Sequence, residues 1–261
     1  MHETYTVITG ASSGIGRAAA RQFASRGSSL ILTARHADQL ASLAEELRRQ
    51  HSQIRTFVVP ADLSRPGEAE RIYEATRAYP VSTWINNAGR GFYGTVSEQN
   101  PADLQAMLEL DVLSVAALSS LYVRDYRDAP GAQLINVSSC GGYLNVPQAV
   151  SYCGAKFFVS AFTEGLALEL LEARAELRAK VFAPAATKTE FGSRANRDPD
   201  YDYSKAFRQF HTADEAASLL MELYDSNAVV GLVDRESFAF ELTGPRFPYA
   251  GGSLANQQRA I

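Results

Sequence analysis

Short apolar runs alternate along the chain with longer segments in which apolar residues recur at helical spacing. The short runs predict strands at Tyr5–Thr9, Ser29–Thr33, Ile54–Val59, Thr83–Asn86, Gln133–Val137, Ala179–Ala183 and Val229–Val233. The longer segments predict helices at about Gly14–Arg26, Ala37–Gln50, Pro66–Ala78, Pro101–Tyr126, Ser151–Glu172 and Thr212–Tyr224. This alternation predicts an α/β fold, in which right-handed crossovers join a mostly parallel sheet covered by helices on both faces.

Two stretches depart from this rhythm. Residues Thr187–Phe210 are polar and aromatic, which is typical of a lid or binding loop, and a short helix can lie within it. The last stretch, about 236–261, has weak periodicity, and we expect it to wrap a surface or a neighbouring subunit. Since no Pro/Gly/Ser linker or repeat divides the chain, we interpret residues 1–261 as a single domain.

Composition and charge argue against several kinds of partner, location and site. A formal net charge of −4 disfavours nucleic acid as the main partner, and no apolar run approaches the length of a membrane span. The N-terminus lacks the pattern of a secretory signal, and two cysteines are too few for a disulfide framework. The four histidines show no metal-ligand spacing, so we predict no metal site. We expect a cytoplasmic protein.

The first strand ends in a glycine-rich turn. Thr9-Gly10-Ala11-Ser12-Ser13-Gly14-Ile15-Gly16 stands where the first helix begins, and its glycines allow backbone to approach a pyrophosphate closely. A glycine-rich turn alone can have no special purpose, but this position is the one that a dinucleotide fold requires. We therefore predict cofactor contacts from Gly10, Ser12, Ser13, Gly14, Ile15 and Gly16.

The end of the second strand indicates which dinucleotide is bound. NAD enzymes usually hold the ribose with an acidic residue about 20 positions beyond the glycine turn, whereas this chain has Ala34-Arg35-His36 and no acid before Asp38. The guanidinium of Arg35 can instead pair with a 2′-phosphate. An exposed arginine without a ligand is the alternative. We predict that NADP(H) is preferred and that NAD(H) is less favoured.

A tyrosine and a lysine stand four residues apart at the start of a predicted helix. Tyr152 and Lys156 therefore share one helix face. A free phenol has a pKa of about 10, and a nearby ammonium favours the phenolate. Ser139, just after the fifth strand, can hydrogen-bond a substrate oxygen. This spacing is weak evidence alone and strong evidence together with the glycine turn, because both meet at the carboxyl edge of the sheet.

In combination, TGASSGIG, Asp62-Leu63, Asn86-Asn87-Ala88-Gly89, Ser139 and Tyr152-x-x-x-Lys156 resemble the short-chain dehydrogenase/reductase family over about Thr4 to Val233. The resemblance implies a seven-stranded Rossmann-type sheet, Tyr152 as acid/base, and Lys156 as ribose ligand. It also implies that Ser139 orients the carbonyl. Further cofactor contacts that it implies are Asp62, Leu63, Asn86, Ala88, Gly89, Pro184, Thr187 and Thr189.

Two positions depart from the family pattern. Asp111 stands where the family has a catalytic asparagine thought to hold a water beside the lysine, and Ala185 stands where glycine is usual. Aspartate loses the amide donor and brings charge near Lys156, so we expect an altered proton relay. These departures also support the alternative of a non-catalytic NADPH sensor. Epimerase or dehydratase chemistry normally needs a further substrate domain, for which this chain has little room.

The family topology also suggests substrate contacts. Arg90, Phe92, Tyr143 and Phe191 are the predicted pocket residues, with Tyr93, Leu144, Tyr201, Tyr203 and Phe207 nearby. So many aromatic residues favour a bulky or aromatic carbonyl substrate, although half of them can simply pack the lid. Cys140 and Cys153 flank the catalytic candidates, and we interpret both as small buried residues. By the same resemblance we expect a homodimer or homotetramer.

Overall fold

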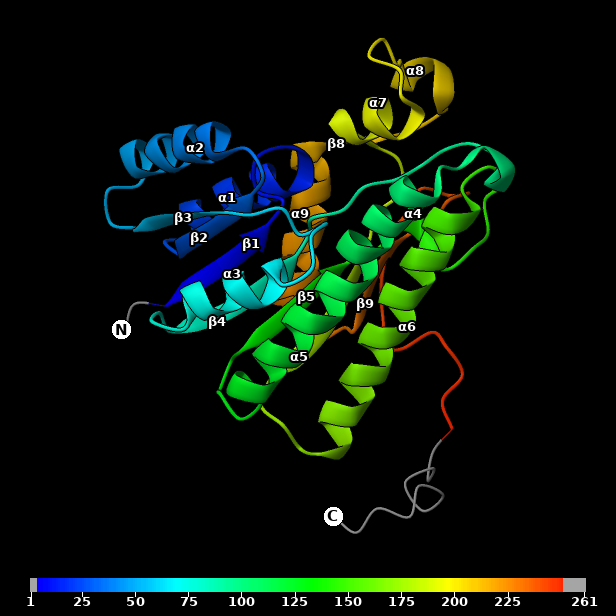
Figure 1. Cartoon of the computed structure of the whole chain (residues 1–261). Coiled ribbons are helices and arrows are strands. Elements are labelled where there is room, and N and C mark those ends of the chain that lie inside the picture. Colours follow the sequence, from blue (N-terminus) through cyan, green and yellow to red (C-terminus); the bar gives the residue numbers. More distant parts are fainter. Residues whose placement is uncertain (1–3, 251–261) are drawn as a thin grey trace.

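In a computed structural model that describes residues 4–250, a sheet of eight strands runs through the molecule (Figure 1). The strands are β1 (Tyr5–Thr9), β2 (Ser29–Ala34), β3 (Thr56–Pro60), β4 (Val81–Asn86), β5 (Gln133–Val137), β6 (Arg178–Ala183), β9 (Val230–Val233) and β10 (Phe240–Thr243). Their order is β10-β9-β6-β5-β4-β1-β2-β3, and only β10 is antiparallel to its neighbour. The predicted α/β fold is confirmed, with one strand more than expected. The order reverses beside β1, which is where open α/β sheets bind ligands.

Helices cover both faces of the sheet. One apolar cluster packs α1 (Gly14–Ser25), α2 (Ala37–Gln50) and α9 (Ala213–Asp225) on one face. A second cluster packs α3 (Glu68–Thr76), α5 (Ser114–Tyr126) and α6 (Val150–Glu172) on the other. Because both faces are buried, the central strands read as continuous apolar runs, which is why their positions could be predicted from sequence.

The predicted helix Pro101–Tyr126 is interrupted by a π-helical turn. It consists of α4 (Pro101–Leu108), the π turn η2 (Glu109–Leu113) and α5. By length and by a mean hydropathy of 1.6 it could cross a membrane, which corrects the expectation that no segment is long and apolar enough. Val115, Leu118 and Tyr122 pack this helix against the protein core, as in the buried helix of a globular protein.

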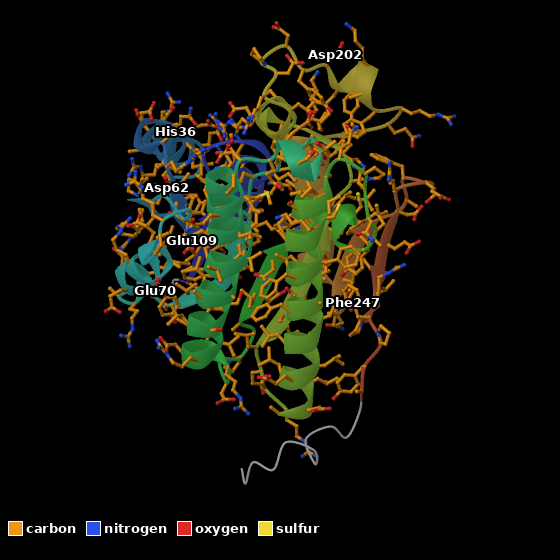
Figure 2. The ribbon with its side chains drawn as sticks, turned by 45° about the vertical axis from the view of Figure 1, so that its right-hand side comes forward. His36, Asp62, Glu70, Glu109, Asp202 and Phe247 are labelled. Carbon is orange, nitrogen blue, oxygen red and sulfur yellow. The ribbon has the colours of Figure 1, made fainter. Side chains whose placement is uncertain are left out.

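The lid, residues 187–210, is more ordered than its sequence predicts. It contains α7 (Glu190–Asn196) and α8 (Tyr203–Ala206), and it stands above the carboxyl edge of the sheet (Figure 1). Its two ends pair as short parallel strands, β7 (Thr187–Lys188) and β8 (His211–Thr212). Asp202 marks the lid at the top of Figure 2.

The C-terminal part of the chain adds the unexpected strand β10 and then runs along α6. Buried Glu164 on α6 accepts hydrogen bonds from the backbone N–H groups of Arg246 and Phe247 at 2.6 and 2.9 Å. The ring of Phe247 stacks on Tyr143, with 5.3 Å between the ring centroids (Figure 2). Through residue 250 the predicted extension therefore packs on its own subunit, and the rest of it, 251–261, lies outside the described residues.

A buried lysine on a neighbouring strand caps the C-terminal end of helix α9. Lys180 on β6 is 1% exposed, and its Nζ donates to the carbonyl oxygens of Leu223, Tyr224 and Ser226 at 2.7–2.9 Å. The Leu223 carbonyl also accepts from the Ser226 N–H, whereas within residues 4–250 the carbonyls of Tyr224 and Ser226 have no other hydrogen bond, so the ammonium satisfies these two and complements the helix dipole.

Substitution of Lys180 by methionine should lower the free energy of unfolding by about 1–3 kcal/mol, because it leaves the carbonyls of Tyr224 and Ser226 unpaired. Burial lowers the pKa of Lys180 to about 8. Above that pH the folded state binds fewer protons than the unfolded state, so wild-type stability should gain on the variant between about pH 8 and 10.5. Urea unfolding at several pH values measures both effects. A constant difference across that range would contradict the assigned pKa.

Candidate active site

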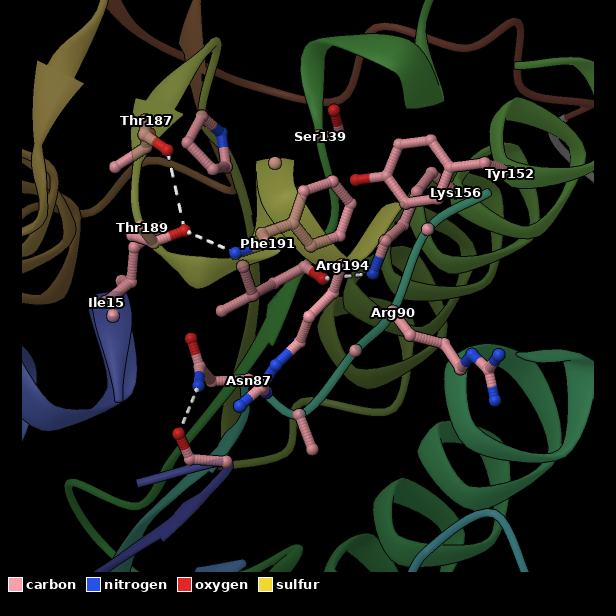
Figure 3. Close-up of a pocket in the computed structure, with 18 of the residues that line it drawn as sticks. Ile15, Asn87, Arg90, Ser139, Tyr152, Lys156, Thr187, Thr189, Phe191 and Arg194 are labelled. Atoms are coloured by element: carbon pink, nitrogen blue, oxygen red, sulfur yellow. Dashed lines mark hydrogen bonds between the residues drawn. The ribbon is translucent and has the colours of Figure 1, made fainter. Parts of the chain in front are cut away.

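One cavity of about 490 Å³ opens at the carboxyl edge of the sheet beneath the lid. It extends from the glycine turn through Arg35 and Asp62 to Ser139, Tyr152 and the lid. Segments far apart in sequence thus contribute to a single cavity (Figure 3). Its volume lies within the range typical of small-molecule and cofactor sites.

The glycine turn is held by the end of β4. Asn87 donates from its side-chain amide to the carbonyl of Thr9 at 2.9 Å, and its backbone N–H donates to Thr9 Oγ1 at the same distance. The same amide donates to the Gly10 carbonyl at 3.3 Å (Figure 3). Gly10 has a φ of +67°, and a Cβ there would lie 2.8 Å from the Cα of Ala88. Glycine is therefore required both by the backbone and by the close approach of β4.

Within the turn, Gly10, Ser12, Ser13, Gly14 and Ile15 line the cavity, whereas Gly16 does not. A Cβ on Gly16 would collide with the Asn87 amide and the Gly10 carbonyl, so this glycine allows α1 to approach the turn. The first N–H groups of α1 lie at the cavity, where they can receive a phosphate.

Arg35, at the end of β2, and Asp62 and Leu63, just after β3, also line the cavity. Asp62 Oδ1 accepts hydrogen bonds from the Ser64 backbone and hydroxyl at 3.2 and 2.6 Å. Burial raises the pKa of Asp62, but these bonds and the charges of Arg35 and Arg65 outweigh it and hold the pKa below its usual range. Arg35 is exposed, and no ion pair to it occurs within residues 4–250.

Ser139, Tyr152 and Lys156 meet in the middle of the cavity, as Figure 3 shows. Ser139 follows β5 and caps the turn η3 (Cys140–Gly142), where its Oγ accepts from the N–H of Gly141 at 3.1 Å. Tyr152 and Lys156 lie on the first turns of α6, and both are more than 90% buried. The Nζ of Lys156 lies 5.8 Å from the centroid of the Tyr152 ring. Three of the four predicted catalytic side chains, Ser139, Tyr152 and Lys156, therefore face one cavity.

Lys156 forms a buried ion pair with Asp111. Its Nζ lies 2.9 Å from Asp111 Oδ1, and the two side chains are 5% and 0% exposed. Asp111 Oδ2 accepts a hydrogen bond from the backbone N–H of Arg90 at 3.0 Å. Burial raises the pKa of Asp111, and the Lys156 ammonium opposes that rise. Asp111 does not line the cavity, so it acts on the site through Lys156.

The π turn η2 is the element that carries Asp111. A π turn widens the helix locally and redirects the side chains within it, and such turns recur at functional sites. The ion pair that the sequence could only suggest is thus produced by this irregularity and by the contact of η2 with α6.

The pKa of Tyr152 differs from the expectation. Burial raises it well above 10, and the nearby phenol of Tyr93 acts in the same direction. The Ser139 hydroxyl opposes the rise through a hydrogen bond, whereas the Asp111 carboxylate adds to it. In the protein without ligands Lys156 therefore does not make the phenol acidic, because its ammonium is paired with Asp111 and the phenol is desolvated.

The segment after β6 forms another part of the cavity wall. Pro184, Thr187 and Thr189 line it, as does Ala185. The Pro184 carbonyl accepts from the N–H of Cys140 at 2.9 Å, which ties this segment to the turn that follows Ser139. Thr189 caps α7 by accepting from the Phe191 N–H at 3.2 Å (Figure 3).

Besides Gly16 and Asp111, three more predicted site residues lie outside the cavity. Asn86 is 2% exposed and does not reach the cavity, because its amide donates to Asn136 at 2.8 Å and to Ser119 at 3.2 Å. Tyr143 turns away to donate to Glu164 at 2.6 Å. Phe92 lies outside the cavity beneath the guanidinium of Arg197. Buried polar partners and an aromatic neighbour thus determine these orientations.

All but one of the remaining residues that the sequence predicted near the cofactor or the substrate line the cavity wall. Ala88, Gly89, Arg90 and Phe191 line it, and so do Tyr93, Tyr201, Tyr203 and Phe207, whereas Leu144 does not. Tyr203 also packs inside the lid, since its hydroxyl accepts from the Gly192 N–H at 2.9 Å. The lining residues that the sequence did not single out as contacts include Asn87, Leu110, Val146, Ala149, Arg194 and Arg235. Only Asn87 had a local signal, because it belongs to the motif that follows β4.

This donor set fits a nicotinamide dinucleotide. The glycine turn and the helix terminus suit a diphosphate, Asp62 and Leu63 suit the adenosine, and the cavity continues from there to Tyr152. Among residues 4–250 no cluster of His, Cys, Asp and Glu suited to a metal ion occurs.

Comparison with known proteins agrees with this geometry. The family model described as short chain dehydrogenase matches residues 4–200. An uncharacterized oxidoreductase, YxnA of Bacillus subtilis, is 31% identical over 73% of this chain and 54% of its own length. Dehydrogenase/reductase SDR family member 11 of Mus musculus is 29% identical over 82% of this chain and 87% of its own. A very-long-chain 3-oxoacyl-CoA reductase from Mycosarcoma maydis is 27% identical over 64% of this chain and 49% of its own length. The chain therefore spans about half the length of this relative and of YxnA.

Solved structures lead to the same conclusion. A short-chain dehydrogenase from Sphingobium yanoikuyae in complex with NADPH superposes with a TM-score of 0.81, 27% identity and 89% coverage of both chains. A short-chain dehydrogenase/reductase from Burkholderia phymatum in complex with NAD gives a TM-score of 0.74 at 26% identity, with 85% of this chain and 86% of that one covered. Sequence, fold and cavity together place this chain in the short-chain dehydrogenase/reductase family of oxidoreductases.

Proposed function

We propose that this protein reduces a ketone or aldehyde with NADPH, and that Tyr152 supplies the proton. The observation that carries the proposal is the single cavity that joins the glycine turn to Ser139, Tyr152 and Lys156. NADPH contributes the hydride. The Ser139 hydroxyl and the Tyr152 phenol hold the carbonyl oxygen, and Tyr152 donates its proton as negative charge develops there. Lys156 holds the ribose hydroxyls.

The protonation state of Tyr152 favours the reductive direction. Because burial keeps its pKa well above 10, the phenol retains its proton near neutrality and can act as the acid. Alcohol oxidation needs the phenolate instead, so that direction should gain with rising pH. Consumption of NADPH by a panel of aldehydes and ketones is the direct assay, and the absence of turnover across the panel would contradict the proposal.

A preference for NADPH is supported by Arg35, which lines the adenosine end without an ion pair among the described residues. Replacement of Arg35 by alanine should weaken NADPH binding roughly tenfold or more and leave NADH binding unchanged, because only NADPH carries the 2′-phosphate. Arg65→Ala is the matched control, since Arg65 lies 3.6 Å from Asp62 but does not line the cavity. Fluorescence titration measures both affinities. Equal losses for the two cofactors would contradict the assignment.

An NADPH-binding sensor is the alternative function. The ion pair of Asp111 with Lys156 favours it, because it leaves less free charge beside Tyr152. A sensor would bind NADPH tightly and turn over nothing in the carbonyl panel. Retention of Ser139, Tyr152 and Lys156 in one cavity supports the enzyme instead.

We also propose that the substrate is bulky or aromatic and that the protein is a homodimer or homotetramer. The first rests on the aromatic wall of Tyr93, Phe191, Tyr201 and Phe207. The second rests on large apolar side chains that α4–α5 and α6 leave exposed: Leu108, Leu113, Val150, Phe158 and Leu171.

A further inference from the structure

The cavity wall carries an excess of positive charge that the chain as a whole lacks. Five cationic side chains line the cavity, and Asp62 is the one carboxylate among the lining residues, although the net charge of the chain is −4. The cations are Arg35, Arg90, Lys156, Arg194 and Arg235. A dinucleotide cofactor is anionic and explains part of this excess, so the question is which cations remain for the substrate.

Three of the five are paired within the protein. Lys156 pairs with Asp111 at 2.9 Å, Arg194 with Glu190 at 2.5 Å, and Arg90 approaches Asp103 at 3.7 Å. Arg35 faces the adenosine end beside Asp62. Arg235 forms neither an ion pair nor a side-chain hydrogen bond within residues 4–250, and it is assigned to no part of the cofactor above.

Arg235 lies at the chemical end of the cavity. Its positive charge acts on the thiol of Cys140 and opposes the rise that burial gives the pKa of that thiol. Cys140 directly follows Ser139 and lines the same cavity. Arg235 thus lines the same cavity as Ser139, the residue proposed to orient the substrate oxygen, and it follows β9, which β6, β5, β4 and β1 separate from β2 and Arg35 in the sheet.

The loop that carries Arg235 is preorganised. Asp234 accepts from the N–H groups of Glu236 and Ser237 at 3.1 and 2.8 Å, and the Asp234 carbonyl accepts from Phe238 at 2.9 Å. The Phe238 ring stacks on His211 at the base of the lid, with 4.5 Å between centroids. Hence the β9–β10 hairpin fixes the backbone of Arg235 against the lid, which reduces the entropy lost when its side chain binds a ligand.

From these observations we infer that Arg235 recognises an anionic group on the carbonyl substrate, so that the enzyme takes keto acids or aldehyde acids with an apolar body. This rests on the proposed function. The aromatic lid side chains contact the body, and the planar guanidinium donates two parallel hydrogen bonds to the oxygens of a carboxylate. Both a carboxylate and a phosphate ester can pair with a guanidinium in this way. We choose a carboxylate as the probe because it is the simpler group.

The test compares acids with their neutral methyl esters. Calorimetry measures the binding of 4-acetylbenzoate, of its longer 4′-acetylbiphenyl-4-carboxylate analogue, and of both methyl esters to the enzyme saturated with NADP⁺. At least one acid should bind roughly tenfold more tightly than its ester, as expected for a charged hydrogen-bonded pair. This preference should shrink as salt is raised, because Arg235 is exposed.

Variants of Arg235 then test whether this residue causes the preference for acids over esters. Arg235→Glu should abolish it and Arg235→Lys should retain part of it, whereas both should bind NADPH like the wild type. Arg208→Glu is the matched control, because Arg208 is an exposed lid residue that does not line the cavity, and it should leave the preference unchanged. Equal affinity for acids and esters, weaker NADPH binding in Arg235→Glu, or the same effect from Arg208→Glu would overturn the inference.

Turnover separates this inference from the proposed function. If the enzyme reduces acids and esters equally well, the proposed function stands and the role of Arg235 fails. If it binds the acids through Arg235 and reduces no carbonyl compound, the anion site stands and the reductase proposal fails.

Discussion

Tyr152→Phe should lower kcat for carbonyl reduction by about 10²–10⁴-fold, because it removes the group that protonates the developing alkoxide. Affinity for NADPH should change little, since Arg35, Asp62 and the glycine turn supply most of the cofactor wall and phenylalanine preserves the shape of the site. Steady-state NADPH oxidation gives kcat, and fluorescence titration gives the affinity.

Tyr143→Phe is the matched control for Tyr152→Phe. Both substitutions remove one buried phenol hydroxyl, but Tyr143 donates to Glu164 outside the cavity. It should keep its turnover and lose about 1 kcal/mol of stability, the usual contribution of one hydrogen bond. Full activity in Tyr152→Phe, or equal losses of turnover in both variants, would refute the role given to Tyr152.

Asp111→Ala should lower the free energy of unfolding by about 3–5 kcal/mol, because it leaves the ammonium of Lys156 buried without its partner. The carboxylate lies 2.9 Å from Nζ, and both side chains are at least 95% buried, so water cannot replace it without local opening. Asp111→Asn should lose less, since the amide oxygen can still accept a hydrogen bond. Guanidinium unfolding measures these losses.

The double variant Asp111→Ala with Lys156→Met shows whether the loss comes from the unpaired charge. Removing both charges should recover much of the stability lost in Asp111→Ala, since paired buried charges are often replaced by apolar groups at little net cost. A double variant as unstable as the sum of the two single variants would mean that the pair is not energetically coupled. NADPH titration of each variant then reports how far the pair positions Lys156 for the ribose.

The ion pair also bears on how the family mechanism operates in this chain. Asparagine at position 111 would be neutral, whereas aspartate places a charge against Lys156, and the same charge raises the pKa of Tyr152. Desolvation acts in the same direction. The arrangement keeps the phenol protonated, which suits a proton donor more than a proton acceptor.

Local patterns accounted for much of the fold. Buried parallel strands such as Ser29–Ala34 read as apolar runs because both faces are covered, and α2 was located to the residue because its apolar face repeats over several turns. The strand β10 was missed because Phe240–Thr243 spans only four residues, none of them fully buried, and shows no alternation of buried and exposed positions. A pattern that short is too weak to distinguish a strand from a loop.

The sequence by itself determined the class of fold, the glycine turn, and the shared helix face of Tyr152 and Lys156, since each depends on residues close together in the chain. Only the tertiary structure decided that Asn87 and not Asn86 reaches the cavity, that Tyr143 turns to Glu164, and that Asp111 pairs with Lys156. It likewise brought Arg235 to the site. These contacts join segments that are distant in sequence, and burial and the competition for hydrogen-bond partners select them only once the chain is packed.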